Sequence, residues 1–185
     1  MVVRSIPAIT GSTSPRGKST MSEQALKELL IKELQDTYSS ETQIIEALPA
    51  MVEAASSPQL KQAFETHLRE TDGQVKRLEQ IFQMLQAEPG GNTCEATQGL
   101  IEETEEIIDE GLPAEVLDVA LIMAAQKVEH YEIASYGSLR TLAETCGMTE
   151  VARLLEQTLD EEKATDQKLN QLAEGGINMR AFKAA

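Results

Sequence analysis

Four long segments of this chain place apolar residues at steps of three and four, which is the spacing of one face of an α-helix. The segments are expected at residues 22–55, 58–87, 114–146 and 149–174. No segment shows the alternation of apolar and polar residues that predicts a half-buried strand, and no hairpin turn sequence is present. The pattern therefore restricts the chain to an all-α fold built from long amphipathic helices.

Short breaks between the segments indicate how the helices connect. A Ser-Ser-Pro sequence at 56–58 and Gly147 each leave room only for a tight turn, so each predicts an antiparallel helix pair. The sequence 89–92 ends the second helix, and 93–113 forms a long connection that contains one short acidic helix. We expect a ferritin-like four-helix bundle, in which this crossover joins the two antiparallel helix pairs.

The helices are expected to form one domain at residues 21–175. Residues 1–20 are rich in Ser, Thr, Pro and Gly and predict a flexible tail, and residues 176–185 are expected as a loosely ordered C-terminal tail. Ser22 is the expected N-cap of the first helix. Pro49 predicts a kink in that helix or its division into two consecutive helices.

Glutamate interrupts the apolar stripe of two of these helices, at Glu41 and Glu132. The two positions are 91 residues apart, and the surrounding sequences match at the same offset, as Leu48 does with Leu139. A buried carboxylate is costly unless it is paired, protonated or bound to a cation. The pseudo-repeat therefore predicts one shared polar site at the centre of the bundle.

Other polar residues are expected at the same height along the bundle. Counting residues from the two turns places five groups within about two helical turns of one another: Glu41, His67, Glu70, Glu132 and either Glu161 or Glu162. No Lys or Arg stands on the stripes at that height, so two explanations fit: a bound pair of metal ions, or a layer of protonated carboxyls. Carboxylate oxygens with few imidazoles favour iron or manganese over zinc or copper.

The spacing of acidic residues in the second half resembles the rubrerythrin-like di-iron motif, in which Glu-x-x-Glu is followed by Glu-x-x-x-His. Here Glu129-x-x-Glu132 is followed by Glu162-x-x-x-Asp166, with Asp166 in the place of the histidine. The first half departs from the pattern, because His67 precedes Glu70 and Gly73 stands where the usual motif places histidine. The candidate metal ligands are Glu41, His67, Glu70, Glu129, Glu132, Glu162 and Asp166.

Several of these candidates have a second interpretation. Asp166 fits equally well an acceptor that orients His67, since a metal-bound imidazole usually has such a partner. Glu70 lies about 100° from the centre of the stripe and also fits an exposed acid. Glu129 would reach the site only from its flank, and His130 points away from the stripe, toward the surface or a second chain.

Five stretches of sequence carry a family resemblance: ELQDTYSSETQ, HLRETDGQVKRLEQIF, CEATQGLIEE, AAQKVEHYEIASYGSLRTLAE and LEQTLDEEKATDQKL. On these stretches, the region 22–174 resembles the YciE/YciF family of bacterial ferritin-like stress proteins. The resemblance implies a ferritin-like bundle, a homodimer and induction under stress. It implies no established activity and does not itself require an occupied metal site.

Composition excludes several other classes of protein. The chain has a net charge of −15, and outside residues 1–20 it carries 13 basic against 31 acidic residues, so binding of the folded part to nucleic acid is not expected. No apolar run reaches the length of a membrane span. Cys94 and Cys146 have no disulfide or zinc spacing, which favours a reducing cytoplasm.

Two functions fit the sequence. The first is a stress-response protein with a dinuclear iron or manganese site that reacts with peroxide or dioxygen. The second is a non-enzymatic, dimeric stress or interaction protein that keeps the fold with a weak or vestigial metal site. Ferritin-like storage in a 24-subunit shell is a third, weaker hypothesis. No nucleophile–base pair or phosphate loop indicates an organic substrate.

Overall fold

The computed structural model describes residues 20–91 and 93–184, and all of its regular elements are helices. The long helices are α1 (Met21–Ala54), α2 (Pro58–Leu85), α4 (Ala114–Thr145) and α5 (Thr149–Leu172). The shorter elements are α3 (Glu95–Asp109), a π-helical turn η1 (Ala173–Ile177) and α6 (Asn178–Ala184). The predicted all-α, ferritin-like four-helix bundle is confirmed.

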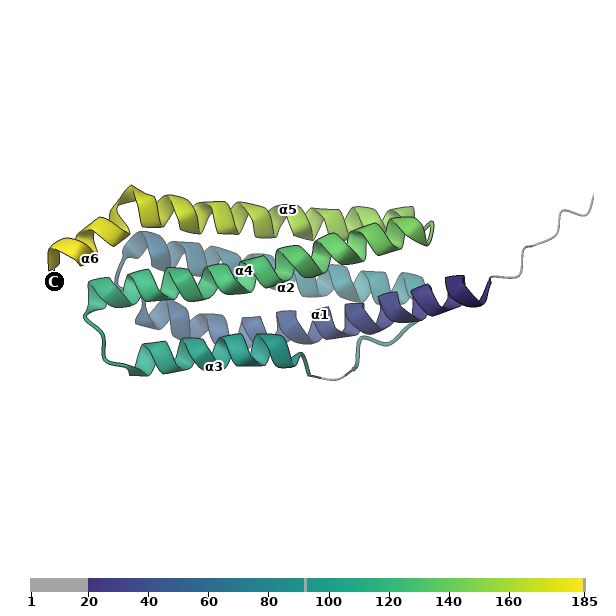
Figure 1. Ribbon diagram of the computed structural model, residues 1–185, viewed down its shortest axis with the longest axis horizontal. Helices are drawn as coiled ribbons and strands as arrows, with labels where there is room; N and C mark the ends of the chain where they lie inside the picture. The colour runs from purple at the N-terminus through teal and green to yellow at the C-terminus, as the bar shows by residue number, and fades with distance from the viewer. Residues whose placement is uncertain (1–19, 92, 185) are drawn as a thin grey trace, which may run out of the picture.

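Two antiparallel hairpins, α1 with α2 and α4 with α5, form the bundle (Figure 1). The chain leaves the far end of α2, returns along the bundle through α3, and then enters α4 (Figure 1). α3 packs on α1 and α4, and α2 lies beside α5. None of the helices in the described residues is long and apolar enough to cross a membrane.

The helix starts and ends follow from local sequence. The Thr20 side chain caps α1 by accepting a hydrogen bond from the backbone N–H of Glu23 at 3.2 Å, so the predicted cap at Ser22 is wrong by two residues. α1 continues through Pro49 as one helix, so of the two alternatives expected there, a kink or a division into two helices, the division is wrong. Pro49 is exposed. Gly147 has a φ of +72°, as expected for a glycine that ends a helix.

The C-terminal residues differ from the expected loose tail. Gly176, with a φ of +130°, redirects the chain between α5 and α6. Ile177 then packs in a hydrophobic cluster, and Ala181 of α6 is buried as well. The burial of Ile177 gives the segment a reason to remain helical. The predicted tail at residues 1–20 lies outside the described residues, apart from Thr20.

Two separate hydrophobic clusters fill the bundle. One contains Leu34 of α1, Leu78 of α2, Leu139 of α4 and Leu155 of α5. The other contains Leu48, Phe64, Leu121 and Leu169 of the same four helices. On each long helix, buried polar residues lie between the positions that belong to the two clusters: Glu41, His67, Thr71, Gln74, Glu129, Glu132 and Glu162. The core is thus divided by a polar layer near its middle.

Candidate metal centre

Four side chains in the polar layer converge closely enough to share a cation. His67, Glu129, Glu132 and Glu162 each offer one ligand atom, and these atoms all lie within 4.8 Å of one another. They come from α2, α4 and α5. All four residues are buried, and Glu162 has no exposed surface.

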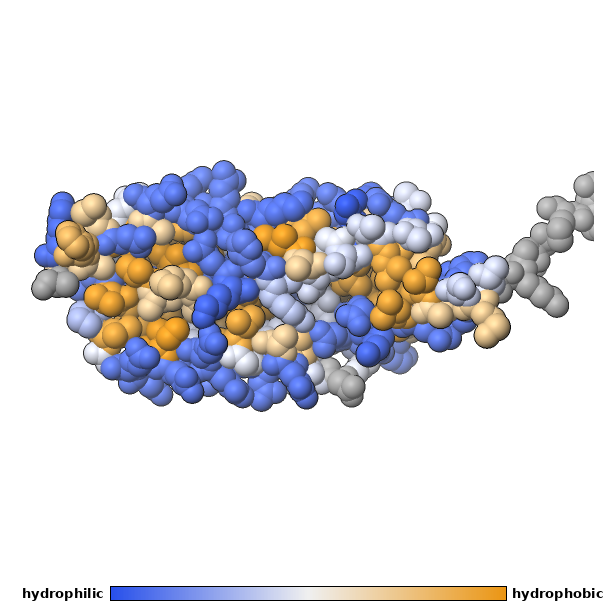
Figure 2. Space-filling view, viewed as in Figure 1, coloured by the Kyte–Doolittle hydropathy of each residue, from blue (hydrophilic) through white to orange (hydrophobic). Residues whose placement is uncertain are grey.

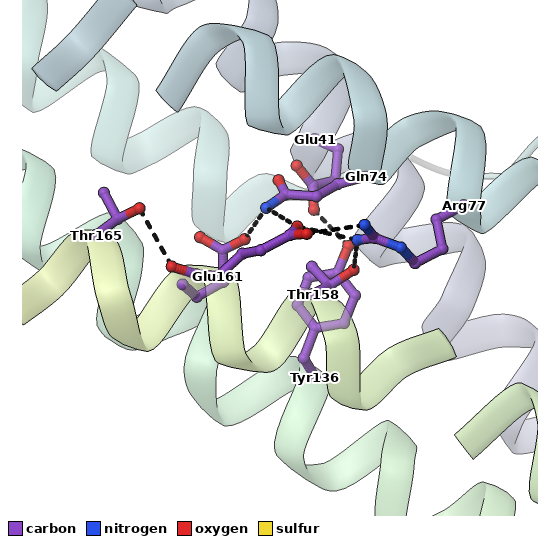
Figure 3. Close-up of polar contacts among 8 residues, drawn as sticks. Glu41, Gln74, Arg77, Tyr136, Thr158, Glu161 and Thr165 are labelled. Atoms are coloured by element: carbon purple, nitrogen blue, oxygen red, sulfur yellow. Dashed lines mark hydrogen bonds and ion pairs between the residues drawn. The ribbon is translucent and has the colours of Figure 1, made fainter. Parts of the chain in front are cut away.

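Glu41 of α1 adds a fourth carboxylate to this layer. It is fully buried, and its charge acts on those of Glu132 and Glu162. Tyr136 of α4 donates a short hydrogen bond from its hydroxyl to Glu41 Oε1 (Figure 3). Each long helix of the bundle therefore supplies at least one of these five side chains, as the pseudo-repeat predicted for Glu41 and Glu132.

Other contacts hold the layer in place from its edge. Gln74 of α2 donates from its amide nitrogen to Glu162 Oε1 and, at 3.2 Å, to Glu161 Oε2. Arg77, one turn further along α2, binds Glu161 with two hydrogen bonds of 2.9 and 3.0 Å, and it also donates to Thr158 (Figure 3). Desolvation raises the pKa of Glu41, and Arg77, which brings a positive charge to the rim of the layer, offsets a part of that rise.

Most of the carboxylate oxygens in the layer lack a donor. Among the described residues, no hydrogen bond reaches Glu41 Oε2, Glu129 Oε2, Glu162 Oε2 or either side-chain oxygen of Glu132, although all five atoms are buried. His67 Nδ1 likewise has no partner in the part of the chain that the structure describes, while its Nε2 lies 3.3 Å from Glu129 Oε1. Buried polar atoms are almost always satisfied, so this set of acceptors fits a metal cation.

Burial raises the pKa values of these carboxyls. Desolvation first, and then repulsion among the carboxylates, holds the pKa values of Glu41, Glu129 and Glu132 well above the usual 4.5, and desolvation raises the pKa of Glu162 to about 7. Desolvation lowers the pKa of His67 to about 4, so its imidazole is neutral at pH 7. A neutral imidazole is the form that binds metals. Without a cation, protons must replace the missing positive charge.

The structure distinguishes Glu161 from Glu162. Glu161 is partly exposed and turns toward Arg77, whereas Glu162 lies inside the layer. Glu129, expected at the flank, is as deeply buried as Glu132. It belongs to the convergent group because it faces His67 across the bundle.

Glu70 and Asp166 are outside the convergent group. Glu70 is half-buried, and desolvation and then the neighbouring Glu161 raise its pKa. Asp166 Oδ1 lies 3.3 Å from Nε2 of the exposed His130 and accepts a hydrogen bond from Gln126 at 3.2 Å. Asp166 is thus partnered with His130 and not with His67, the residue that it was predicted to orient.

Sequence reasoning gave no site role to Gln74 or Arg77. Gln74 does stand on the apolar stripe of its helix, three residues after Thr71 and four before Leu78, so its position carried a signal. Arg77 is off the stripe. Only the packing of α2 against α5 brings it to Glu161.

Comparison with known proteins places the chain among bacterial relatives. The model of the family "Domain of unknown function (DUF892)" matches residues 25–182. Protein YciF of Escherichia coli (strain K12) is 48% identical over 166 residues, which are 89% of this chain and 100% of that protein.

Solved structures agree with this comparison. The crystal structure of the E. coli stress protein YciF matches with a TM-score of 0.80 and 49% identity, over 83% of this chain and 97% of that one. YcfI of Rhodopseudomonas palustris matches with a TM-score of 0.77 and 44% identity, over 82% of this chain and 96% of that one. A Xanthomonas campestris protein shares the fold, with a TM-score of 0.71 and 24% identity, over 86% of this chain and 97% of that one.

Proposed function

The chain belongs to the DUF892 family, and from this premise we propose that it is a stress-response protein with a dinuclear iron or manganese site in the bundle core. The five side chains proposed to hold the metal are Glu41, His67, Glu129, Glu132 and Glu162. Glu70 and Asp166 are proposed to complete the site from its rim, since the charge of Glu70 acts on Glu162 and that of Asp166 acts on Glu129.

The single observation that carries this proposal is the set of five buried carboxylate oxygens without a hydrogen-bond donor in the described part of the chain. When ionised, Glu41, Glu129, Glu132 and Glu162 carry four negative charges in a region shielded from water. Two divalent cations would balance that charge. A donor set of carboxylate oxygens with one imidazole suits iron or manganese.

Such a metal pair, when bound, would supply electrons to peroxide or dioxygen by changing oxidation state. The residues around it have supporting tasks. Tyr136 holds Glu41 and Gln74 holds Glu162, so these carboxylates are oriented before metal binds. The hydrophobic clusters on both sides exclude water from the layer.

Metal analysis tests the proposal directly. Protein purified without chelator, or reloaded with Fe²⁺ under anaerobic conditions, is expected to hold about two metal ions per chain. Addition of peroxide or dioxygen to the ferrous protein should then produce ferric absorbance. A content far below one ion per chain, together with no rebinding of Fe²⁺, would remove the basis of the proposal.

A second candidate function is a non-enzymatic stress protein with a weak or vestigial site. The observation that favours it is the pairing of Asp166 with His130, at the position where the di-iron motif would place a histidine ligand. Metal that binds weakly and does not react with peroxide or dioxygen would support this second function over the first.

The proposal includes a homodimer in the cytoplasm. Large apolar side chains are exposed at Met123 of α4 and at Met179 and Phe182 of α6, and Figure 2 shows hydrophobic residues gathered on the face that carries α3 and α4. Such surface favours burial against another chain.

Cys94 and Cys146 are both free, which fits a reducing compartment such as the cytoplasm. Size-exclusion chromatography with light scattering measures the number of chains, and a 24-chain mass would instead indicate a ferritin-like shell.

A further inference from the structure

A pocket of about 550 Å³ adjoins the candidate metal centre. His67 and Glu129 of the convergent group line it, and so does Glu70. His67 and Glu129 are buried, whereas Glu105 and Lys168, which also line the pocket, are exposed. The pocket therefore extends from the surface to the carboxylate layer.

The walls of this pocket are mainly hydrocarbon. They include Ile44, Leu48, Met51, Phe64, Val128 and Leu169, which come from four different helices. Hydrogen peroxide and dioxygen are about the size of water and need no such space. A volume of about 550 Å³ falls in the range of pockets that hold drug-sized organic ligands, which are typically apolar with a few polar groups.

The charges at the inner end restrict the head group of the ligand. Glu129 lies there beside the neutral His67, and the only Lys or Arg among the described lining residues, Lys168, is exposed, so no cationic side chain is placed to pair with a buried anionic head such as a fatty-acid carboxylate. A neutral head that can donate and accept hydrogen bonds meets no such penalty. An apolar tail with a neutral, reducible head is the combination that matches both ends.

We propose that this pocket binds the hydrocarbon tail of an alkyl hydroperoxide and presents its O–O bond at His67 and Glu129. This inference rests on the proposed function and names its substrate class. In the reaction the O–O bond breaks, one oxygen leaves as the alcohol, and the other leaves as water. Two electrons would come from the two divalent metal ions of the proposed site, each of which would lose one, and two protons would come from solvent.

The first test measures binding without catalysis. Metal-free protein is titrated with the neutral fluorescent probe N-phenyl-1-naphthylamine, and 1-decanol, which resembles the alcohol product, is used to displace it. One displaceable site per chain is expected. Ala63→Trp and Ala47→Trp each place a large side chain on the pocket wall and should weaken binding at least about tenfold. Ala134→Trp, at an exposed position of α4 outside the pocket, is the matched control.

The second test compares two oxidants on ferrous protein. Ala63→Trp should slow metal oxidation by decyl hydroperoxide at least about tenfold more than it slows oxidation by hydrogen peroxide. Two variants on different helices guard against a single misfolded one, and circular dichroism checks each. Probe binding that survives both substitutions, or equal slowing of the two oxidants, overturns the inference.

Other outcomes separate this inference from the proposed function. If metal binds and hydrogen peroxide oxidises it, but no aliphatic probe binds, the inference fails and the proposed function stands. If probe and decanol bind but the protein takes up no metal, the proposed function fails, and the hydroperoxide inference fails with it. Binding of one probe per two chains that is lost on dilution would show that a second copy forms the pocket wall, and this would also overturn the inference.

Discussion

Tyr136 and Glu41, 95 residues apart in the chain, meet in the bundle core, where the tyrosine hydroxyl donates a hydrogen bond to the carboxylate. Both residues are fully buried. The contact joins α4 to α1 where the polar layer borders one of the two hydrophobic clusters, which contains Tyr136. It fixes the orientation of one carboxylate oxygen, and the other oxygen of Glu41 has no donor within the described residues.

Tyr136→Phe should weaken both the fold and the metal site, because it leaves a buried oxygen of Glu41 without its donor. We expect the free energy of unfolding of the metal-free protein to fall by about 1–3 kcal/mol and the affinity for Mn²⁺ to fall about tenfold or more. Urea denaturation and metal titration measure these two quantities. Tyr38→Phe is the control, since the Tyr38 hydroxyl makes a long, exposed contact of 3.4 Å with Glu79. An equal effect of both substitutions would contradict the assignment.

Asp118→Ala should destabilise the protein without affecting metal binding. Asp118 of α4 is buried and accepts hydrogen bonds from the backbone N–H groups of Ser56 and Ser57, at 2.7 and 2.9 Å, and from the Ser56 hydroxyl at 2.8 Å. Its loss leaves the turn between α1 and α2 with unpaired donors, so we expect a decrease of about 3 kcal/mol in the free energy of unfolding. Glu115→Ala, on the exposed first turn of α4, should change it by less than about 0.5 kcal/mol.

The fold could be predicted from the sequence because apolar residues recur at helical spacing through the whole of each long segment. The predicted ends of the four helices lie within about two residues of the observed ones. Gly147 and the Ser-Ser-Pro sequence required turns that the structure contains. The C-terminal helix was missed because Gly175 and Gly176 end one helix without indicating whether another follows. The burial of Ile177, which decides this, depends on tertiary contacts.

The candidate site followed only in part. The helical spacing of the apolar residues alone predicted that four polar residues face inward, because each stands on the apolar stripe of its helix: Glu41, His67, Glu132 and Glu162. Asp166 was assigned from its spacing, yet one of its carboxylate oxygens meets His130 and Gln126 of α4 and the other accepts from Asn170 of its own helix. Contacts between helices depend on the rotation of each helix about its own axis relative to its neighbour. That rotation cannot be derived from a single sequence.

The metal-free protein should be most stable near pH 4.5 and should lose stability as pH rises, because four buried carboxyls with raised pKa values outweigh one histidine with a lowered pKa. The folded pKa of Glu162 is raised, so the stability that Glu162 contributes is fully present below the unfolded value of 4.5 and is lost as pH rises through about 7. The raised pKa values of Glu41, Glu129 and Glu132 act in the same direction. The lowered folded pKa of His67 acts in the opposite direction, since its contribution is present above 6.5 and is lost as pH falls toward 4.

Chemical denaturation in the presence of a chelator, at pH 5, 6.5 and 8.5, measures this dependence. The free energy of unfolding should fall between pH 6.5 and 8.5. Bound Mn²⁺ should reverse that trend, because metal competes with protons for the same oxygens. A Glu162→Gln variant should show a smaller decrease. An unchanged stability between pH 6.5 and 8.5 in the metal-free protein would argue against carboxyls that are protonated in the fold.

Glu161 and Glu162 provide a matched pair for locating the metal ligands, because they are adjacent, chemically identical and differ in where they point. Glu162 is buried within 4.8 Å of three other candidate ligands, whereas Glu161 is partly exposed and bound to Arg77. Glu162→Gln should lower Mn²⁺ affinity at least about tenfold, and Glu161→Gln should change it less than about twofold. Isothermal titration calorimetry measures both affinities. If Glu161→Gln has the larger effect, α5 presents Glu161 and not Glu162 to the metal, and the proposed ligand set is incorrect.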